Sequence, residues 1–229
     1  MLLADEVYQE NVYDETAEFY SCKHAAADLG LIDNDAIELI SFHSVSKGLF
    51  GECGRRGGYM ELAGIDSKVK DYLYKLASSG LCSSLDGQVM MSLMVRGPSP
   101  GSVSYESHQK EMRGVFESLK VRAKVISEGL NSIPGFSCQQ AQGAMYCFPA
   151  IQMPKGALVA SEKQSISPDT LYAVDLLQET GICVVPASGF RQKSGRYGMR
   201  TTFLPPEQQM RDAVGAIAKH YQDFCVRYR

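Results

Sequence analysis

The first part of the chain alternates short apolar runs with longer amphipathic segments, and this alternation restricts the fold more than any other feature. Apolar runs of strand length are buried on both faces only inside a sheet of parallel strands. The amphipathic segments supply helices that connect such strands and cover the sheet. The pattern therefore predicts an α/β fold with a mostly parallel sheet. The expected strands are residues 2–5, 38–43 and 57–62, and the expected helices run from Thr16 towards Leu29, from the N-cap Asp66 through Leu76, and over residues 85–95.

The clearest break in the pattern is the Gly-Pro-Ser-Pro-Gly-Ser run at residues 97–102. Because Gly and Pro interrupt helices and strands, we place a domain boundary there. The prediction is a first domain of residues 1–100 and a smaller α+β domain of residues 101–229. The expected elements of the second domain are a long amphipathic helix from Met112 to Leu130, strands on both sides of residues 142–144, a polar loop over 154–168, a helix over 169–180, strands over 182–185 and 198–204, and a terminal helix from Pro205 towards Val226.

Composition excludes several classes of function. The 229 residues carry a formal net charge of -3, which leaves no basic footprint for nucleic acid. No apolar run reaches the roughly 20 residues that span a bilayer, and the first residues lack the pattern of a signal peptide. The seven cysteines are scattered, without the close pairs of a zinc site. They indicate reduced thiols in an intracellular protein and predict no metal site.

A lysine in a loop rich in serine and glycine is the main candidate for chemistry. Lys47 follows Ser44-Val45-Ser46 at the end of an expected strand, and Arg56 comes nine residues later. An amine, hydroxyl groups and a guanidinium together suit a phosphorylated aldehyde, which needs a Schiff base and anchors for its phosphate. The ordinary alternative is a solvated surface lysine, the commonest fate of this residue type. Of the two adjacent arginines, we expect Arg56 to face the site and Arg55 to face water.

Further candidates lie on either side of this loop. Asp5 ends an expected strand, where open α/β sheets bind ligands, and its carboxylate can pair with a protonated pyridine nitrogen. Tyr8 follows it and offers a phenolic hydroxyl. Arg200 lies on an apolar strand, where it needs an anionic partner such as a substrate carboxylate. Ordinary alternatives are a helix cap for Asp5, packing for Tyr8 and a solvent-facing strand edge for Arg200. We interpret His43, just before the loop, as a packing residue.

These residues occur in the order that one enzyme family uses. The chain resembles the alanine aminotransferases, which belong to the fold-type-I, aspartate-aminotransferase-like class of pyridoxal-phosphate enzymes. The resemblance implies the C-terminal part of a fold-type-I large domain, followed by the smaller C-terminal domain. The blocks that carry it run from one end of the chain to the other: LLADEVYQENVY, SFHSVSKGLFGECGRRGGY, QGAMYCFP, LLQETGICVVPASGF and MRTTFLPP.

The resemblance also implies an activity, the transfer of an amino group from L-alanine to 2-oxoglutarate with pyridoxal 5'-phosphate as cofactor. The implied partners are small amino acids and 2-oxo acids, with a homodimer as the assembly and the cytoplasm, or else the mitochondrion, as the location. The implied site residues are Lys47 as the Schiff-base amine and proton carrier, Asp5 at the pyridinium, Tyr8 at the ring oxygen, Ser44 and Arg56 at the phosphate, and Arg200 at the substrate carboxylate.

The main departure from the family is length, because the family's chains are about twice as long. The strand expected at residues 2–5 has no turn before it, which predicts the interior of a longer protein. Two other hypotheses therefore stay open. The chain is a truncated, inactive fragment or an interaction partner of a full-length subunit, or it is another enzyme of this fold, such as a carbon-sulfur lyase or a different transaminase.

Overall fold

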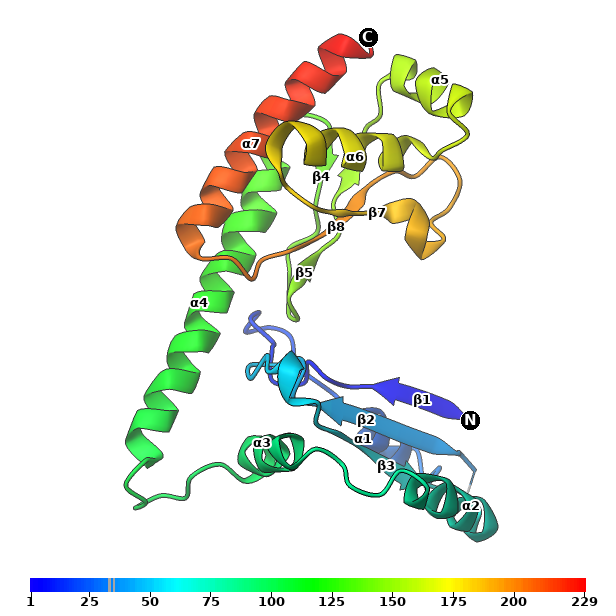
Figure 1. The fold of residues 1–229 in the computed structure, drawn as a ribbon, viewed down its shortest axis with the longest axis vertical. Coiled ribbons are helices and arrows are strands. Elements are labelled where there is room, and N and C mark those ends of the chain that lie inside the picture. Colours follow the sequence, from blue (N-terminus) through cyan, green and yellow to red (C-terminus); the bar gives the residue numbers. More distant parts are fainter. Residues whose placement is uncertain (33, 35) are drawn as a thin grey trace. The chain divides into compact units, whose positions relative to one another are not determined.

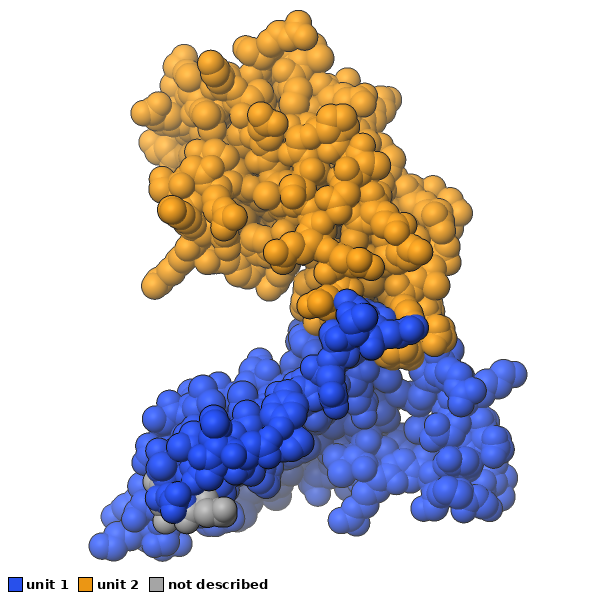
Figure 2. Space-filling view, turned by 180° about the vertical axis from the view of Figure 1, so that it is seen from behind, with its two compact units in different colours: residues 1–115 blue, residues 116–229 orange. Residues whose placement is uncertain are grey.

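The computed structural model describes residues 1–32, 34 and 36–229. They form two compact units, residues 1–115 and residues 116–229, which Figure 2 colours separately. The units divide within the long helix α4 (Tyr105–Asn131), whereas the predicted boundary at residue 100 lies in the turn before that helix. The division into domains of residues 1–100 and 101–229 stays a prediction.

The first unit is built on a three-stranded sheet with the order β1-β2-β3, visible in Figure 1. Strands β1 (Leu2–Asp5) and β2 (Leu39–Ser44) run parallel, and β3 (Gly58–Ala63) runs antiparallel to β2. All three expected strands are present within one residue of their predicted ends. The β2–β3 pair departs from the expected parallel arrangement because a loop without a crossover helix joins these strands, and a parallel return needs such a crossover. The sheet is therefore mixed.

The register of this sheet brings the carboxyl ends of two strands together. Asp5 of β1 pairs with Phe42 of β2, and Ser44 at the end of β2 pairs with Gly58. Parallel strands end at the same sheet edge, so the segments that follow Asp5 and Ser44 leave the sheet side by side. Val45, the first residue after β2, is fully buried and anchors the start of the next loop.

The first helix, α1 (Cys22–Asp28), begins five residues later than an N-cap at Thr16 predicts. Its N-cap is Ser21, whose hydroxyl accepts a hydrogen bond from the backbone N–H of His24 at 3.0 Å. The prediction of a start at Thr16 is wrong. The backbone N–H and the hydroxyl of Thr16 both donate to Asp14 Oδ1, at 2.9 and 2.7 Å. This local turn competes with a helix start for the same groups.

Helices α2 (Ser67–Ser78) and α3 (Leu85–Arg96) of the first unit confirm the predicted helical runs. The predicted cap is also confirmed, since Asp66 Oδ1 accepts hydrogen bonds from the first backbone N–H groups of α2. A capping carboxylate accepts hydrogen bonds from backbone N–H groups that have no partner inside the helix. Its negative charge also interacts favourably with the positive end of the helix dipole.

The second unit packs helices against two small antiparallel sheets. One sheet pairs β4 with β6, and the other has the order β5-β8-β7. The part of α4 that belongs to this unit, from Phe116 onward, buries Leu119, Ala123, Ile126 and Leu130. The other elements are β4 (Phe136–Ser137), β5 (Tyr146–Cys147), β6 (Ala150–Ile151), α5 (Lys155–Lys163), α6 (Pro168–Thr180), β7 (Val185–Pro186), β8 (Met199–Thr202) and α7 (Glu207–Arg227).

Two expectations for this unit are wrong, and a third is met only by short strands. The polar loop over 154–168 contains α5, whose buried face is made of the small residues Ala157 and Ser161 and gives little apolar signal. The strands expected on both sides of residues 142–144 are present as the two-residue strands β4 and β5. The first of them ends at Ser137, just before Cys138, whose N–H and C=O are both hydrogen-bonded by the side chain of Asn131. The strand expected over 182–185 begins only at Val185, since the N–H of Ile182 donates to the Thr180 hydroxyl.

No helix in the described residues has the length and apolar character that crossing a bilayer requires.

Candidate functional site

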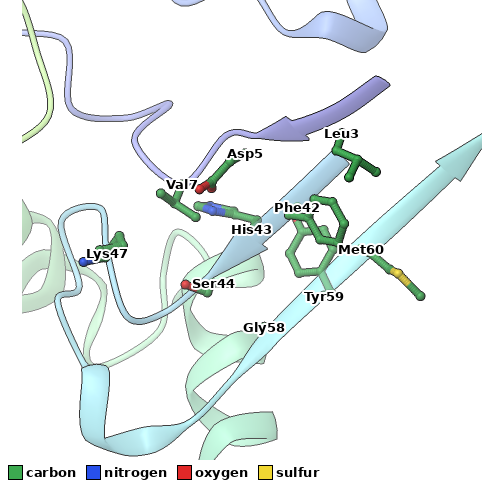
Figure 3. Close-up of a pocket in the computed structure, with 10 residues that line it drawn as sticks. All are labelled: Leu3, Asp5, Val7, Phe42, His43, Ser44, Lys47, Gly58, Tyr59 and Met60. Carbon is green, nitrogen blue, oxygen red and sulfur yellow. The ribbon is translucent and has the colours of Figure 1, made fainter. Parts of the chain in front are cut away.

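A cavity of about 710 Å³ lies in the first unit, beside the ends of β1 and β2 (Figure 3). It brings together three of the residues that the sequence singled out: the carboxylate of Asp5, the hydroxyl of Ser44 and the amine of Lys47. The remaining walls are mainly apolar and aromatic. The lining residues are Leu3, Asp5, Val7, Phe42, His43, Ser44, Lys47, Gly58, Tyr59 and Met60.

The loop after β2 places Lys47 in this cavity. Its start is fixed by buried Val45, whose N–H donates to the Gly57 carbonyl at 3.1 Å and whose carbonyl accepts from Glu52. Next to the lysine, Gly48 has φ +67°, and a Cβ there would lie 3.3 Å from the Val7 carbonyl oxygen. Glycine therefore lets the lysine loop pack closely on the segment that follows Asp5. The half-buried lysine stands where two strand ends and their loops meet.

His43 also lines the cavity, and Figure 3 shows its imidazole beside the carboxylate of Asp5. Burial lowers the pKa of His43 below its ordinary value, while the carboxylates of Glu10, Glu6 and Asp5 act in the opposite direction. The imidazole also packs edge-on against Tyr59, with ring centroids 5.8 Å apart. The packing interpretation is therefore incomplete, because this side chain faces the cavity too. In the sequence, the signal that His43 would face the cavity was its position directly before Ser44.

Arg56 contacts the lysine loop but lines a different cavity. Its guanidinium donates to the Cys53 carbonyl at 2.9 Å and to the Ser46 hydroxyl at 3.4 Å. The second cavity, of about 460 Å³, lies along α3, from Ser83 before the helix to Arg96 at its end. The closely packed backbones of Gly57 and Gly87 join these segments, since a Cβ on Gly57 would come within 2.5 Å of the Gly87 carbonyl oxygen. The structure thus places Arg56 against the lysine loop but not among the residues that line the Lys47 cavity.

The remaining candidates have different surroundings. Tyr8 is half-buried after β1 and is not among the residues lining the Lys47 cavity. Arg55 is exposed and faces Asp86 at 3.3 Å, so its expected solvent-facing position is confirmed. Arg200 belongs to β8 of the second unit, where its Cζ lies 4.8 Å from the ring centroids of both Tyr146 and Phe190. In the described residues no carboxylate forms an ion pair with Arg200.

Comparison with curated proteins identifies relatives along the whole chain. The probable mitochondrial alanine aminotransferase of Dictyostelium discoideum is 48% identical over 100% of this chain, which covers 43% of that protein. The mitochondrial alanine aminotransferase 1 of Arabidopsis thaliana is 46% identical, again over 100% of the chain and 42% of the relative. Glutamate--glyoxylate aminotransferase 1 of the same plant is 42% identical, and the chain covers 47% of it. The chain thus spans less than half the length of these relatives.

Solved structures and a family model agree with this result. An alanine aminotransferase from Pyrococcus furiosus matches with a TM-score of 0.74 and 25% identity. The match covers 96% of this chain and 49% of the Pyrococcus furiosus chain. An aminotransferase from Escherichia coli has a TM-score of 0.70 and 25% identity, covering 99% and 49%. These likenesses confirm the expected fold class. The family model described as aminotransferase class I and II matches residues 1–217. The chain therefore belongs to the class I and II aminotransferases.

Proposed function

We propose that the protein transfers an amino group between L-alanine and 2-oxoglutarate, using pyridoxal 5'-phosphate held at Lys47. The observation that supports this most directly is the single cavity shared by Asp5, Ser44 and Lys47. Membership of the aminotransferase family and relatives named as alanine aminotransferases support the reaction and the amino donor. The chain spans under half the length of these relatives. The proposed activity is therefore that of the full-length protein that contains this sequence, whether that is this chain or a longer one.

The cavity residues fit such a cofactor chemically. Apolar and aromatic walls suit a pyridine ring, and the cavity offers one carboxylate, one hydroxyl and one amine. When bound, pyridoxal 5'-phosphate would supply an aldehyde that condenses with an amine and a ring that accepts electrons from the substrate Cα. Asp5 would hold the protonated ring nitrogen through its carboxylate. Tyr8, just outside the lining residues, would donate its hydroxyl to the ring oxygen.

The remaining roles concern protons and anions. Lys47 Nζ would bind the aldehyde carbon and, once released by the incoming amino acid, carry the proton to and from the substrate Cα. Ser44 Oγ would donate to the phosphate, and Arg56, hydrogen-bonded to Ser46, would supply the positive charge. Arg200 would bind the substrate carboxylate through its planar N–H donors.

Further parts of the proposal extend to the assembly and the compartment. The partners are small amino acids and 2-oxo acids, and the assembly is a homodimer in the full-length context. We place the protein in the cytoplasm and extend the proposed location to mitochondria, because several of its relatives are named as mitochondrial.

A second candidate function follows from strand β1. In the described chain this strand pairs only with β2, and Leu2 and Leu3 on it are 42% and 61% exposed. An apolar strand with an open edge is a surface for pairing with another chain. This observation favours a chain that is inactive alone and pairs with a longer subunit.

Trapping the cofactor on its lysine tests the leading proposal. The purified chain is mixed with pyridoxal 5'-phosphate, reduced with borohydride and digested, and the modified peptide is identified by mass spectrometry. We expect one dominant adduct at Lys47, lost in Lys47→Ala and retained in the control Lys68→Ala, which removes an exposed lysine. Labelling spread over several lysines would contradict a formed site in this chain and favour the second candidate.

A further inference from the structure

Two aromatic rings from different segments contact the guanidinium of Arg200. Tyr146 belongs to β5, and Phe190 ends the short 3-10 helix Ala187–Phe190. The Cζ atom of Arg200 lies 4.8 Å from each ring centroid. Both distances are within the range in which the negative face of an aromatic ring attracts a cation. The guanidinium therefore contacts two rings.

Both rings are fixed by interactions that do not involve Arg200. Strand β5 pairs with β8, and Tyr146 lies opposite Thr202 in that ladder. The Ala187–Phe190 turn is tied down by its backbone, since the N–H of Ser188 donates to Oδ2 of buried Asp169 at 2.8 Å. These contacts order the rings before any ligand binds.

A third aromatic ring, that of Phe148, supports the position of Phe190. Phe148 packs edge-on against Phe190, with centroids 5.3 Å apart. The N–H of Ala187 also donates to the Gly198 carbonyl at 2.9 Å, which links the turn to the segment just before β8. Phe190 is thus braced from its ring and from its backbone.

The rings do not provide the hydrogen-bond acceptors that the guanidinium of Arg200 requires. Its guanidinium is half-buried, and within the described residues no carboxylate pairs with it. Aromatic faces attract the charge but cannot accept five planar N–H donors. A planar carboxylate matches two of those donors at once, whereas lysine offers no such fork.

We infer that Tyr146 and Phe190 are positioning residues that hold Arg200 ready for the carboxylate of a 2-oxo acid or amino acid. The inference rests on the proposed function and adds the residues that set the strength of carboxylate recognition. By restricting the side-chain rotamers of Arg200 in advance, the rings reduce the entropy lost when a carboxylate binds. They contact the arginine and need not touch the substrate.

The test uses the whole chain, without cofactor, and pyruvate as the probe. Side-chain Nε–Hε signals of the arginines are recorded by NMR, and Arg200→Lys identifies the Arg200 signal. We expect ring currents to shift this signal away from those of exposed arginines, and pyruvate to shift it further. In Phe190→Leu and Tyr146→Leu the ring-current shift should shrink, and the Kd for pyruvate should rise about fivefold.

Two variants separate positioning from general packing. Phe190→Trp restores an aromatic face and should return the affinity for pyruvate close to that of the unchanged chain. Phe148→Leu, the matched control, removes a neighbouring ring that packs on Phe190, and should change the affinity much less than Phe190→Leu. Equal affinities in the unchanged chain and Phe190→Leu, failure of Phe190→Trp to rescue, or no response of Arg200 to pyruvate would each overturn the inference. If no Lys47 adduct formed while the Arg200 signal still responded to pyruvate, only the proposed function of this chain would be rejected.

Discussion

At the scale of single residues, His43 links the cavity to pH. Its imidazole is half-buried, and burial lowers its pKa, with Glu10, Glu6 and Asp5 opposing that effect. The folded state therefore disfavours the protonated imidazole relative to the unfolded chain, where its pKa is about 6.5. Between the two pKa values the unfolded chain binds more protons, so acid favours unfolding. The contribution of neutral His43 to stability is complete above the unfolded pKa and is lost as the pH falls through the folded pKa.

We expect the free energy of unfolding to decrease as the pH falls below about 6.5, the pKa of histidine in the unfolded chain, and His43→Asn to remove part of this decrease. Urea unfolding followed by circular dichroism at several pH values measures how the free energy of unfolding depends on pH in the unchanged chain and in the variant. The control is His24→Asn, which changes an exposed histidine on α1. If His43→Asn retained the full pH dependence of the unchanged chain, His43 would not be its source.

At the scale of elements, one carboxylate fastens α6 to α7. Asp175 of α6 accepts a hydrogen bond from Nε2 of buried His220 at 2.8 Å and two from Arg227, both at 2.9 Å. The Asp175 side chain is 14% exposed, so its charge is only partly screened by water. These contacts lie beside the aromatic core formed by Tyr172 and Phe224, whose ring centroids are 5.2 Å apart.

Asp175→Asn should lower the free energy of unfolding by about 2 kcal/mol, because it removes the charge that both partners share and leaves polar groups of buried His220 poorly paired. Glu179→Gln is the matched control on the same helix. Its carboxylate lies 3.9 Å from Arg227 and is 59% exposed, so its loss should cost less than about 0.5 kcal/mol. Denaturant titration compares the two variants, and equal costs would refute the assignment of Asp175 as the fastening residue.

At the scale of the whole molecule, we expect the open edge of β1 in the described chain to promote association. Backbone groups along this edge are available for pairing with another strand, and Leu2 beside them is 42% exposed. We expect the chain to self-associate with rising concentration, and Leu2→Lys to reduce this by placing a charge on the edge. Sedimentation velocity measures the change. Leu76→Lys, a matched substitution at an exposed position of α2, should leave association unchanged, and equal effects of the two lysines would argue against the edge.

The elements that could be predicted from sequence depend on neighbours a few residues away. The strands that end at Asp5 and Ser44 follow from their apolar runs, and the start of α2 follows from Asp66 as a cap. The lysine loop is equally local, because glycine and serine next to Lys47 signal a turn that can approach a ligand. Local patterns also mislead, as at Thr16, where Asp14 engages the groups that a helix cap would use.

Backbone preference and apolar periodicity are local properties, so the strands, most helices and the candidates Asp5, Ser44 and Lys47 could be predicted from the sequence. The cavity that these three residues share could not, because the parallel pairing of β1 with β2 joins residues far apart in the chain. The same holds for His43, which faces that cavity, and for the rings around Arg200, which the β5–β8 pairing and the Asp169 contact bring together. Such contacts depend on long-range packing, which no local pattern encodes.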